Sequence, residues 1–134
     1  MKPYALIIVD MIKDNVDLKR NSKFDAQVSK IIPSINKLSD TFRKHSSPVV
    51  YACDSFMPND FIFKGKMKPH AIRGTGGDLP IDELNPHSSD HILLKRRMSA
   101  FYKTDLDQSL RLWGVETIVV TGIVTNVCVL LTAF

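Results

Sequence analysis

The sequence predicts an α/β fold built on a doubly wound parallel sheet, and three observations support this prediction. Short apolar runs of strand length recur along the chain, at 4–9, 49–53, 91–94 and 116–121. Amphipathic stretches with helical spacing, or a long loop, separate these runs. No repeat or low-complexity tract interrupts the order. Strands that alternate with helices are typical of a parallel sheet that carries helices on both faces, a three-layer α/β/α arrangement.

The first two strands each end at an acidic residue. Residues 4–9 (YALIIV) form a continuous apolar run, which predicts a strand buried on both faces, and Asp10 follows directly. Residues 49–53 (VVYAC) predict a second buried strand, which Asp54 follows. Between these strands, apolar residues recur at steps of three and four over 24–42, which is one face of a helix.

Pro33 lies inside this helical pattern. A proline in a helix interior removes a hydrogen bond and clashes with the preceding turn. We therefore expect Pro33 either to kink the helix or to lie near the start of its main part.

The second half of the chain opens with a long irregular segment. Residues 57–86 hold four of the seven prolines and four of the six glycines, and we expect a loop that packs over one end of the sheet. A second helix is expected to begin near Thr104 or Asp105 and to end at Gly114, and a third helix to begin near Cys128.

Composition indicates one domain, 1–134, that is long enough to bury a core. The net charge of +4 is spread along the chain without a recognisable nucleic-acid-binding module, so we expect no nucleic-acid partner. The apolar runs are shorter than a membrane span, so we expect no membrane partner and a cytoplasmic location. The two cysteines provide no disulfide framework, which favours reduced thiols.

Four polar residues fall at the carboxyl ends of the predicted strands, where functional groups of such sheets collect. Asp10, Asp54 and Lys95 follow the first three strands, and Cys128 opens the helix after the fourth. Asp10, Lys95 and Cys128 together supply a base, a cation and a nucleophile. A helix N-terminus and a nearby ammonium are expected to lower the pKa of the thiol, and a carboxylate can accept its proton.

The chain resembles the isochorismatase-like cysteine hydrolases, which include nicotinamidases and N-carbamoylsarcosine amidases. Five motifs carry the resemblance, in the order of the family and over nearly the whole chain. They are 5–11 (ALIIVDM), 48–55 (PVVYACDS), 69–75 (PHAIRGT), 95–101 (KRRMSAF) and 122–129 (GIVTNVCV).

The resemblance implies a catalytic triad of Asp10, Lys95 and Cys128. It implies that this triad hydrolyses a carboxamide or ureido C–N bond of a small molecule through a thioester. It places the oxyanion hole at the backbone N–H groups of Val124 and Cys128, after a cis peptide bond between Ile123 and Val124. It also implies a homo-oligomer, a dimer or larger.

Nicotinamidases of this family bind a metal at three positions, and the sequence matches two of them, at Asp54 and His70. The remaining position is Phe56, which cannot ligate a metal, so we expect no metal and no cofactor. His70 is then expected to bond Asp54 or to fix the loop at Gly74. A ureido or aliphatic amide substrate, as in the N-carbamoylsarcosine branch, becomes the leading hypothesis, and nicotinamide is the alternative.

Four apolar residues are candidates for lining the substrate pocket. For the three phenylalanines among them, the alternative is that they pack in the hydrophobic core. Arg73, Arg96 and Arg97 are either partners of a substrate carboxylate or solvated surface residues. The pocket candidates are Phe56, Phe61, Phe63 and Ile123.

Two other classes of protein remain open, a catalytically inactive binding protein of this fold and a redox-sensing thiol protein. Both would keep Cys128 but have no need of Asp10 and Lys95. Family members continue for tens of residues beyond the cysteine, so we expect the domain to be incomplete at its C-terminus and to lack its last strands. The fourth strand would then be an exposed apolar edge.

Overall fold

The computed structural model describes residues 3–134, in which four strands form one parallel sheet. The strand order across the sheet is β3-β2-β1-β4, so the chain starts in the centre and winds outward in both directions. Each strand lies within one residue of its predicted bounds. The strands are β1 (Tyr4–Val9), β2 (Val49–Asp54), β3 (His91–Lys95) and β4 (Thr117–Gly122).

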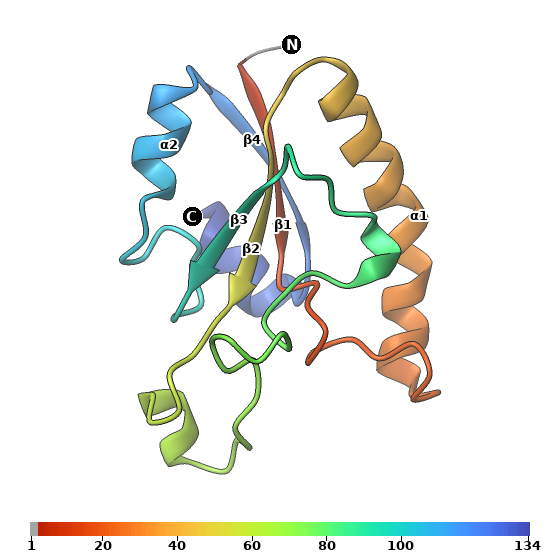
Figure 1. Ribbon diagram of the computed structural model, residues 1–134, viewed down its shortest axis with the longest axis vertical. Helices are drawn as coiled ribbons and strands as arrows, with labels where there is room; N and C mark the ends of the chain where they lie inside the picture. Colours follow the sequence, from red (N-terminus) through yellow and green to blue (C-terminus); the bar gives the residue numbers. More distant parts are fainter. Residues whose placement is uncertain (1–2) are drawn as a thin grey trace.

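Helices cover both faces of the sheet, which confirms the predicted three-layer fold (Figure 1). α1 (Lys23–Lys44) lies on one face. α2 (Leu106–Leu112) lies on the other face, together with the π-helical turn Thr125–Val129 and the short helix α3 (Leu130–Ala133) that follows it. No helix among residues 3–134 is long and apolar enough to cross a membrane.

The alternation of side chains along β1 divides the core into two layers. Leu6 and Ile8 pack in the layer that contains the buried face of α1, and Ile7 and Val9 pack in the layer that contains Leu106 of α2. Both sets are almost fully buried. A strand that is buried on both faces reads as a continuous apolar run, which is why β1 could be recognised from the sequence.

α1 runs without interruption from Lys23 to Lys44, so Pro33 neither starts nor ends it. The helix begins ten residues earlier, where the Ser22 hydroxyl accepts the N–H of Asp25 at 3.0 Å. This N-cap, together with the apolar face that α1 buries, outweighs the cost of one proline in the interior.

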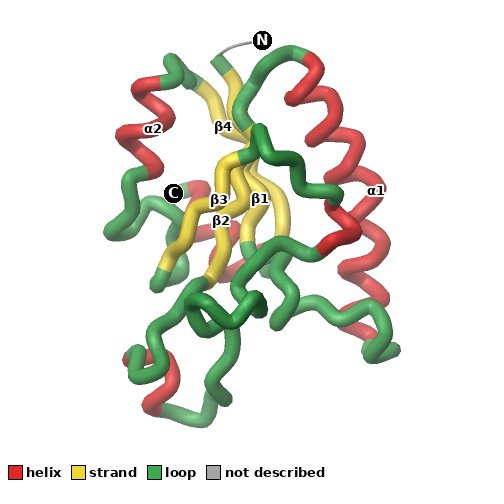
Figure 2. Tube along the Cα trace, in the orientation of Figure 1, coloured by secondary structure: helices red, strands yellow, loops and turns green. Residues whose placement is uncertain are grey.

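The irregular segment 57–86 covers the carboxyl end of the sheet, as predicted (Figure 2). Its second half is tied to the chain after β1, because the Asp14 carboxylate accepts the N–H of Ala71 at 2.8 Å. Gly77 packs so closely on Asp14 that a Cβ there would lie 2.1 Å from the carboxylate. By contrast, residues 64–69 are exposed throughout.

Candidate active site

Asp10 lies directly after β1 and is 2% exposed. Its backbone is in the left-handed region with φ 55°, a conformation that aspartate tolerates better than most residues. One carboxylate oxygen accepts the N–H of Asp54 at 2.9 Å, and the other accepts Lys95 Nζ at 3.2 Å. The side chain of Asn15 donates to the Asp10 carbonyl at 3.1 Å, which fixes the turn. The carboxylate is therefore held in one orientation.

Lys95 is the last residue of β3, and its side chain is completely buried. Its ammonium donates to Asp54 at 2.6 Å, to Asp10 at 3.2 Å and to the carbonyl of Arg97 at 3.0 Å. Burial works against the charged form, but the carboxylates of Asp10 and Asp54 outweigh it and raise the pKa of Lys95. Lys95 is therefore an ammonium at neutral pH.

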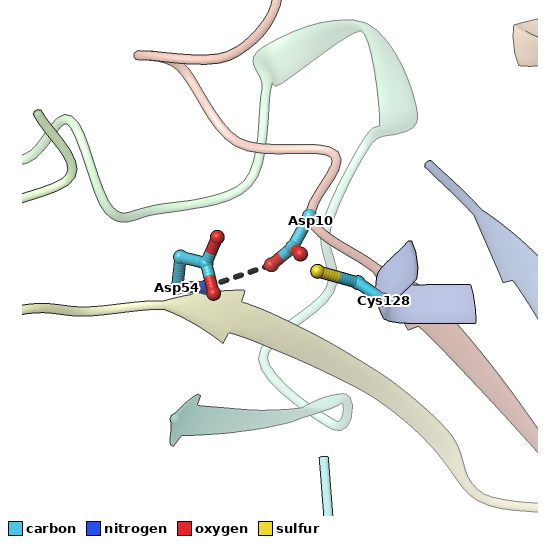
Figure 3. A group of neighbouring side chains, drawn as sticks. All are labelled: Asp10, Asp54 and Cys128. Atoms are coloured by element: carbon cyan, nitrogen blue, oxygen red, sulfur yellow. Dashed lines mark hydrogen bonds between the residues drawn. The ribbon is translucent and has the colours of Figure 1, made fainter. Parts of the chain in front are cut away.

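Cys128 approaches Asp10 from the β4 edge of the sheet, opposite to the β3 edge that carries Lys95. Cys128 is 7% exposed and belongs to the π-helical turn after β4. Its sulfur points at the Asp10 carboxylate (Figure 3). The Cys128 sulfur, one carboxylate oxygen of Asp10 and one of Asp54 all lie within 4.8 Å of one another. The sulfur also contacts the Met98 sulfur at 3.7 Å. The three predicted catalytic residues therefore converge on one buried cluster.

The electrostatics of Cys128 differ from the prediction of a lowered pKa. Burial, followed by the negative charge of Asp10, raises the pKa of the Cys128 thiol, and Lys95 offsets only part of this effect. The cysteine at rest is therefore a neutral thiol beside a base. The sequence indicates a helix start and a nearby cation, both of which would lower the pKa of the thiol. It does not show that the sulfur is buried and lies beside a carboxylate, and both of these features raise the pKa.

Gly122 allows the ends of β1 and β4 to approach each other closely. Its φ is 114°, and a Cβ at this position would lie 2.2 Å from the carbonyl oxygen of Val9. The N–H of Ile123 donates to this same carbonyl at 3.0 Å. Since Asp10 follows Val9, this contact sets the distance between Asp10 and the turn that carries Cys128.

The peptide bond between Ile123 and Val124 is cis, as the family resemblance implied. The carbonyl of Val124 accepts the N–H groups of Val127 and Val129, both at 3.2 Å, and so begins the π-helical turn. Val124 itself is 38% exposed.

A cavity of about 410 Å³ opens onto the cluster and connects it with the surface. Ile123 lines this cavity, as expected, but the three phenylalanines do not. Phe56 is buried in the core, Phe63 packs edge-on against it at 5.3 Å, and Phe61 is 75% exposed. The lining residues are Asp10, Asp14, Asn15, Phe24, Asp54, Ile62, Met67, His70, Met98, Ile123, Val124, Val127 and Cys128.

The two metal positions expected from the resemblance, Asp54 and His70, do not suit a metal here. Asp54 already pairs with the Lys95 ammonium, and burial, followed by the charge of Asp10, raises the pKa of Asp54 to about 6. His70 bonds the Lys68 carbonyl through Nδ1 at 2.9 Å and packs edge-on against Phe56. The expected bond from His70 to Asp54 or to the loop at Gly74 is not formed within residues 3–134. A cation among these groups would have to displace Lys95.

The structure adds residues and roles that the sequence does not predict. Asp54, expected from the resemblance at a metal position, accepts the shortest hydrogen bond of the Lys95 ammonium, at 2.6 Å. A signal for this role exists, because Asp54 and Lys95 end neighbouring strands and are register partners across β2 and β3. Met67 and Met98, which line the cavity, come from irregular segments without such a signal.

The three arginines considered as substrate ligands lie outside this cavity. Arg96 donates to the Asp60 carboxylate through Nε and Nη2, and Arg73 donates to Ser55. Arg97 donates to a backbone carbonyl and is exposed. None of the three belongs to the cavity lining given above.

The fold is a three-layer α/β sheet with a buried cluster of Asp10, Lys95 and Cys128 at its carboxyl end, and comparison with known proteins identifies the family. The isochorismatase domain model matches residues 4–134, so the chain belongs to the isochorismatase family. The predicted class, an isochorismatase-family hydrolase, is confirmed.

Three relatives illustrate the similarity. An uncharacterized isochorismatase family protein of Bacillus subtilis, YwoC, is 33% identical over 96% of this chain and 67% of its own length. The N-carbamoylsarcosine amidase of Thermoplasma acidophilum is 34% identical, with a TM-score of 0.84 over 99% of this chain and 74% of that one. The pyrazinamidase of Pyrococcus horikoshii, solved in complex with zinc, is 27% identical, with a TM-score of 0.83 over 98% and 76%.

Proposed function

We propose that this protein hydrolyses the C–N bond of a small ureido compound or aliphatic amide, with Cys128 as the nucleophile. The observation that carries the proposal is the buried position of Asp10, which lies beside the Cys128 sulfur and accepts the Lys95 ammonium at 3.2 Å, at the end of an open cavity. A redox sensor or a binding protein has no use for a base and an ammonium that are both held in place around the thiol. The similarity to an N-carbamoylsarcosine amidase supports the same class of reaction.

The first half of the reaction forms a thioester. The Cys128 sulfur attacks the substrate carbonyl while Asp10 takes the thiol proton, so no free thiolate is needed beforehand. The backbone N–H groups of Val124 and Cys128 bind the negative oxygen of the tetrahedral intermediate. When the C–N bond breaks, Asp10 returns the proton to the leaving nitrogen, and ammonia departs.

The second half regenerates the enzyme. A water molecule enters the position that ammonia has left, and Asp10 removes one of its protons as the water attacks the thioester carbonyl. The C–S bond then breaks, the sulfur recovers the proton from Asp10, and the acid product leaves. Each half-reaction therefore begins and ends with Asp10 ionised.

Lys95 acts as a positioning residue in this scheme. Its ammonium holds Asp10 and Asp54 at 3.2 and 2.6 Å, which keeps two carboxylates side by side in a buried place. Without the Lys95 ammonium, the two carboxylates would share a proton. Their oxygens lie within 4.8 Å of each other, and two like charges so close together in a buried site disfavour the ionisation of both groups. Asp10 would then lose its capacity as a base.

The metal positions favour a ureido or aliphatic amide substrate over nicotinamide. The pyrazinamidase with the same fold was solved in complex with zinc. In this chain Phe56 is buried in the core, and Asp54 is paired with Lys95. An aromatic amide that depends on a metal for binding would lack its anchor in this cavity.

A substrate panel tests the proposal directly. Purified protein is incubated with N-carbamoyl amino acids, aliphatic amides and nicotinamide, and the release of ammonia is measured. We expect activity on the first two groups, its loss in Cys128→Ala, and its retention in Cys53→Ala, because Cys53 is buried in the other layer of the core.

Each outcome of the panel bears on a specific part of the proposal. Full activity of Cys128→Ala would contradict the covalent mechanism. Preferential hydrolysis of nicotinamide would assign the protein to the nicotinamidases instead. A folded protein that is inactive on every compound would favour the binding or redox class.

A further inference from the structure

A second hollow, of about 460 Å³, lies beside β3 and shares no lining residue with the catalytic cavity. It is strongly basic, with four cationic side chains and no acidic one among its lining residues in the described chain. We call it the basic hollow. Its lining residues are Arg73, Leu94, Arg96, Arg97, Tyr102 and Lys103.

The alternation of side chains at the end of β3 separates the two sites. Lys95 points into the core toward Asp10, whereas its neighbours Leu94 and Arg96 line the basic hollow. The carbonyl of Arg97 nevertheless accepts the Lys95 ammonium at 3.0 Å. Residues 94–97 therefore contribute Lys95 to the cluster at Asp10, and Leu94, Arg96 and Arg97 to the lining of the basic hollow.

Only one of the four cations in the basic hollow has an ion-pair partner within residues 3–134. Arg96 is bound to the buried carboxylate of Asp60. Arg73, Arg97 and Lys103 form no ion pair there. Three like charges in one concave place repel one another, and bound anions relieve this repulsion.

Two of the guanidinium groups are held in place by neutral acceptors, which leaves their charge available. Arg73 donates through Nε to the Ser55 hydroxyl at 3.0 Å and through Nη2 to the Ser55 carbonyl at 3.3 Å. Arg97 donates to the Arg96 carbonyl at 2.8 Å. A guanidinium that is already oriented loses less conformational freedom when it binds an anion with its remaining donors.

We propose that the basic hollow binds a small molecule that carries at least two negative charges on neighbouring oxygens, as in a phosphate ester or a di- or tricarboxylate. Planar forks of N–H donors match such groups bidentately. The exposed ring of Tyr102, with Lys103 Nζ 6.0 Å from its centre, offers an apolar wall for the rest of the ligand. A polynucleotide would need a longer basic stripe than this single hollow.

Anion binding in the basic hollow does not depend on the proposed amidase activity, because the basic hollow and the catalytic cavity share no lining residue. The proposed ligand also differs from the proposed substrate. The cavity at Cys128 takes a carbonyl compound to be cleaved, whereas the basic hollow would hold an anion that remains intact.

Isothermal titration calorimetry at low ionic strength tests the proposal. Pyrophosphate and citrate are titrated separately into the purified protein, with sodium chloride of equal ionic strength as the blank. We expect saturable binding of at least one of them, weakened about tenfold or more in the double variant Arg97→Gln/Lys103→Gln, which removes two unpaired cations. Comparison of the two titrations decides between phosphate and carboxylate chemistry.

A matched control separates local binding from general charge. Lys64→Gln/Lys66→Gln removes the same net charge from exposed positions of the long loop that do not line the basic hollow. It should bind like the wild type, and circular dichroism should show that both double variants are folded. Equal weakening in the two double variants, or the lack of saturation in the wild type, would overturn the proposal.

Discussion

At the scale of single residues, the site depends on positions where only a few amino acids fit. Gly122 is the clearest of these positions, because both its φ of 114° and the nearby Val9 backbone exclude a side chain. Asp10, at φ 55°, is the other residue with a left-handed backbone in the cluster. The close approach of the β1 and β4 backbones therefore helps to set the position of Asp10 relative to the turn that carries Cys128.

We predict that Gly122→Ala destabilises the protein far more than Gly114→Ala. Both glycines have positive φ, so each alanine carries a cost of about 1–2 kcal/mol. At Gly114 a Cβ would meet nothing within 4 Å, whereas at Gly122 it would lie 2.2 Å from the Val9 carbonyl. Urea unfolding of both variants measures the difference, and equal losses of stability would show that the close approach is not needed.

The state of Cys128 gives a second prediction at this scale. The negative charge of Asp10 raises the pKa of the thiol, so Asp10→Asn should lower this pKa and let iodoacetamide react at a lower pH. Lys95→Ala should have the opposite effect. The rate of alkylation as a function of pH, measured in a Cys53→Ala background, provides the test.

This experiment separates the reactivity of the thiol from catalysis. Asp10→Asn should alkylate more readily than the wild type near neutral pH and yet release no ammonia, because it lacks the base. Slower alkylation of Asp10→Asn would mean that Asp10 promotes the thiolate at rest, and the concerted proton transfer would have to be abandoned.

At the scale of elements, α1 shows how packing overrides a local preference. The helix keeps an unbroken course through Pro33, although this residue cannot donate a backbone hydrogen bond. Its buried face, which includes Val28, Ile32 and Ile35, holds both halves against the sheet.

We therefore predict that Pro33→Ala stabilises the protein. Alanine restores a hydrogen-bond donor at an exposed position of the helix and relieves the clash of the ring, with a gain of about 1–3 kcal/mol in the free energy of unfolding. Thermal and urea unfolding measure the gain. The control should be an exposed helix residue without a tertiary hydrogen bond, which excludes Asn36, whose side chain donates to the Glu83 carbonyl. Ser34→Ala, one residue along the same exposed surface, is the suitable control. A loss of stability in Pro33→Ala would contradict the prediction.

The strands and the three residues of the cluster could be predicted from the sequence, whereas the environment of individual side chains could not. The strands could be located because β1 and β2 are buried on both faces and read as unbroken apolar runs. Asp10, Lys95 and Cys128 could be selected because parallel strands end at one edge. The raised pKa of Cys128 and the place of Phe56 could not be predicted, because both depend on which neighbours surround a side chain in three dimensions.

At the scale of the whole molecule, the buried charges of the site affect stability as well as chemistry. Asp54, Asp10 and Lys95 are all buried, with exposed fractions of 8%, 2% and 0%. Burial raises the pKa of Asp54 to about 6, above the ordinary value of 3.8. The folded protein therefore binds a proton at Asp54 more tightly than the unfolded chain does.

The sign of the resulting pH dependence follows from linkage. Between pH 4 and pH 6 the folded state holds more protons at Asp54 than the unfolded state, so this residue makes the protein less stable as the pH rises. We predict that Asp54→Asn removes this effect. The stability of Asp54→Asn relative to the wild type should increase from pH 4 to pH 7, by at most on the order of 3 kcal/mol.

Urea unfolding of both proteins at pH 4, 5, 6 and 7 measures this change. Asp25 and Asp60 have pKa values lowered to about 2 by their arginine partners and by hydrogen bonds, so they titrate below this window in the folded state. They are present in both proteins and cancel in the difference. A difference that does not vary with pH would show that Asp54 is ionised throughout.

The long loop is divided into a part that is tied to the fold and a part that is not. Residues from Ala71 onward are fixed to Asp14, whereas 64–69 are exposed, and Met67 from this stretch reaches the catalytic cavity. Lengthening an exposed loop costs little free energy. For protein engineering, 64–69 is therefore a suitable place to insert or randomise residues when a new substrate range is wanted, since these residues lie outside the buried cluster at Asp10 and Cys128.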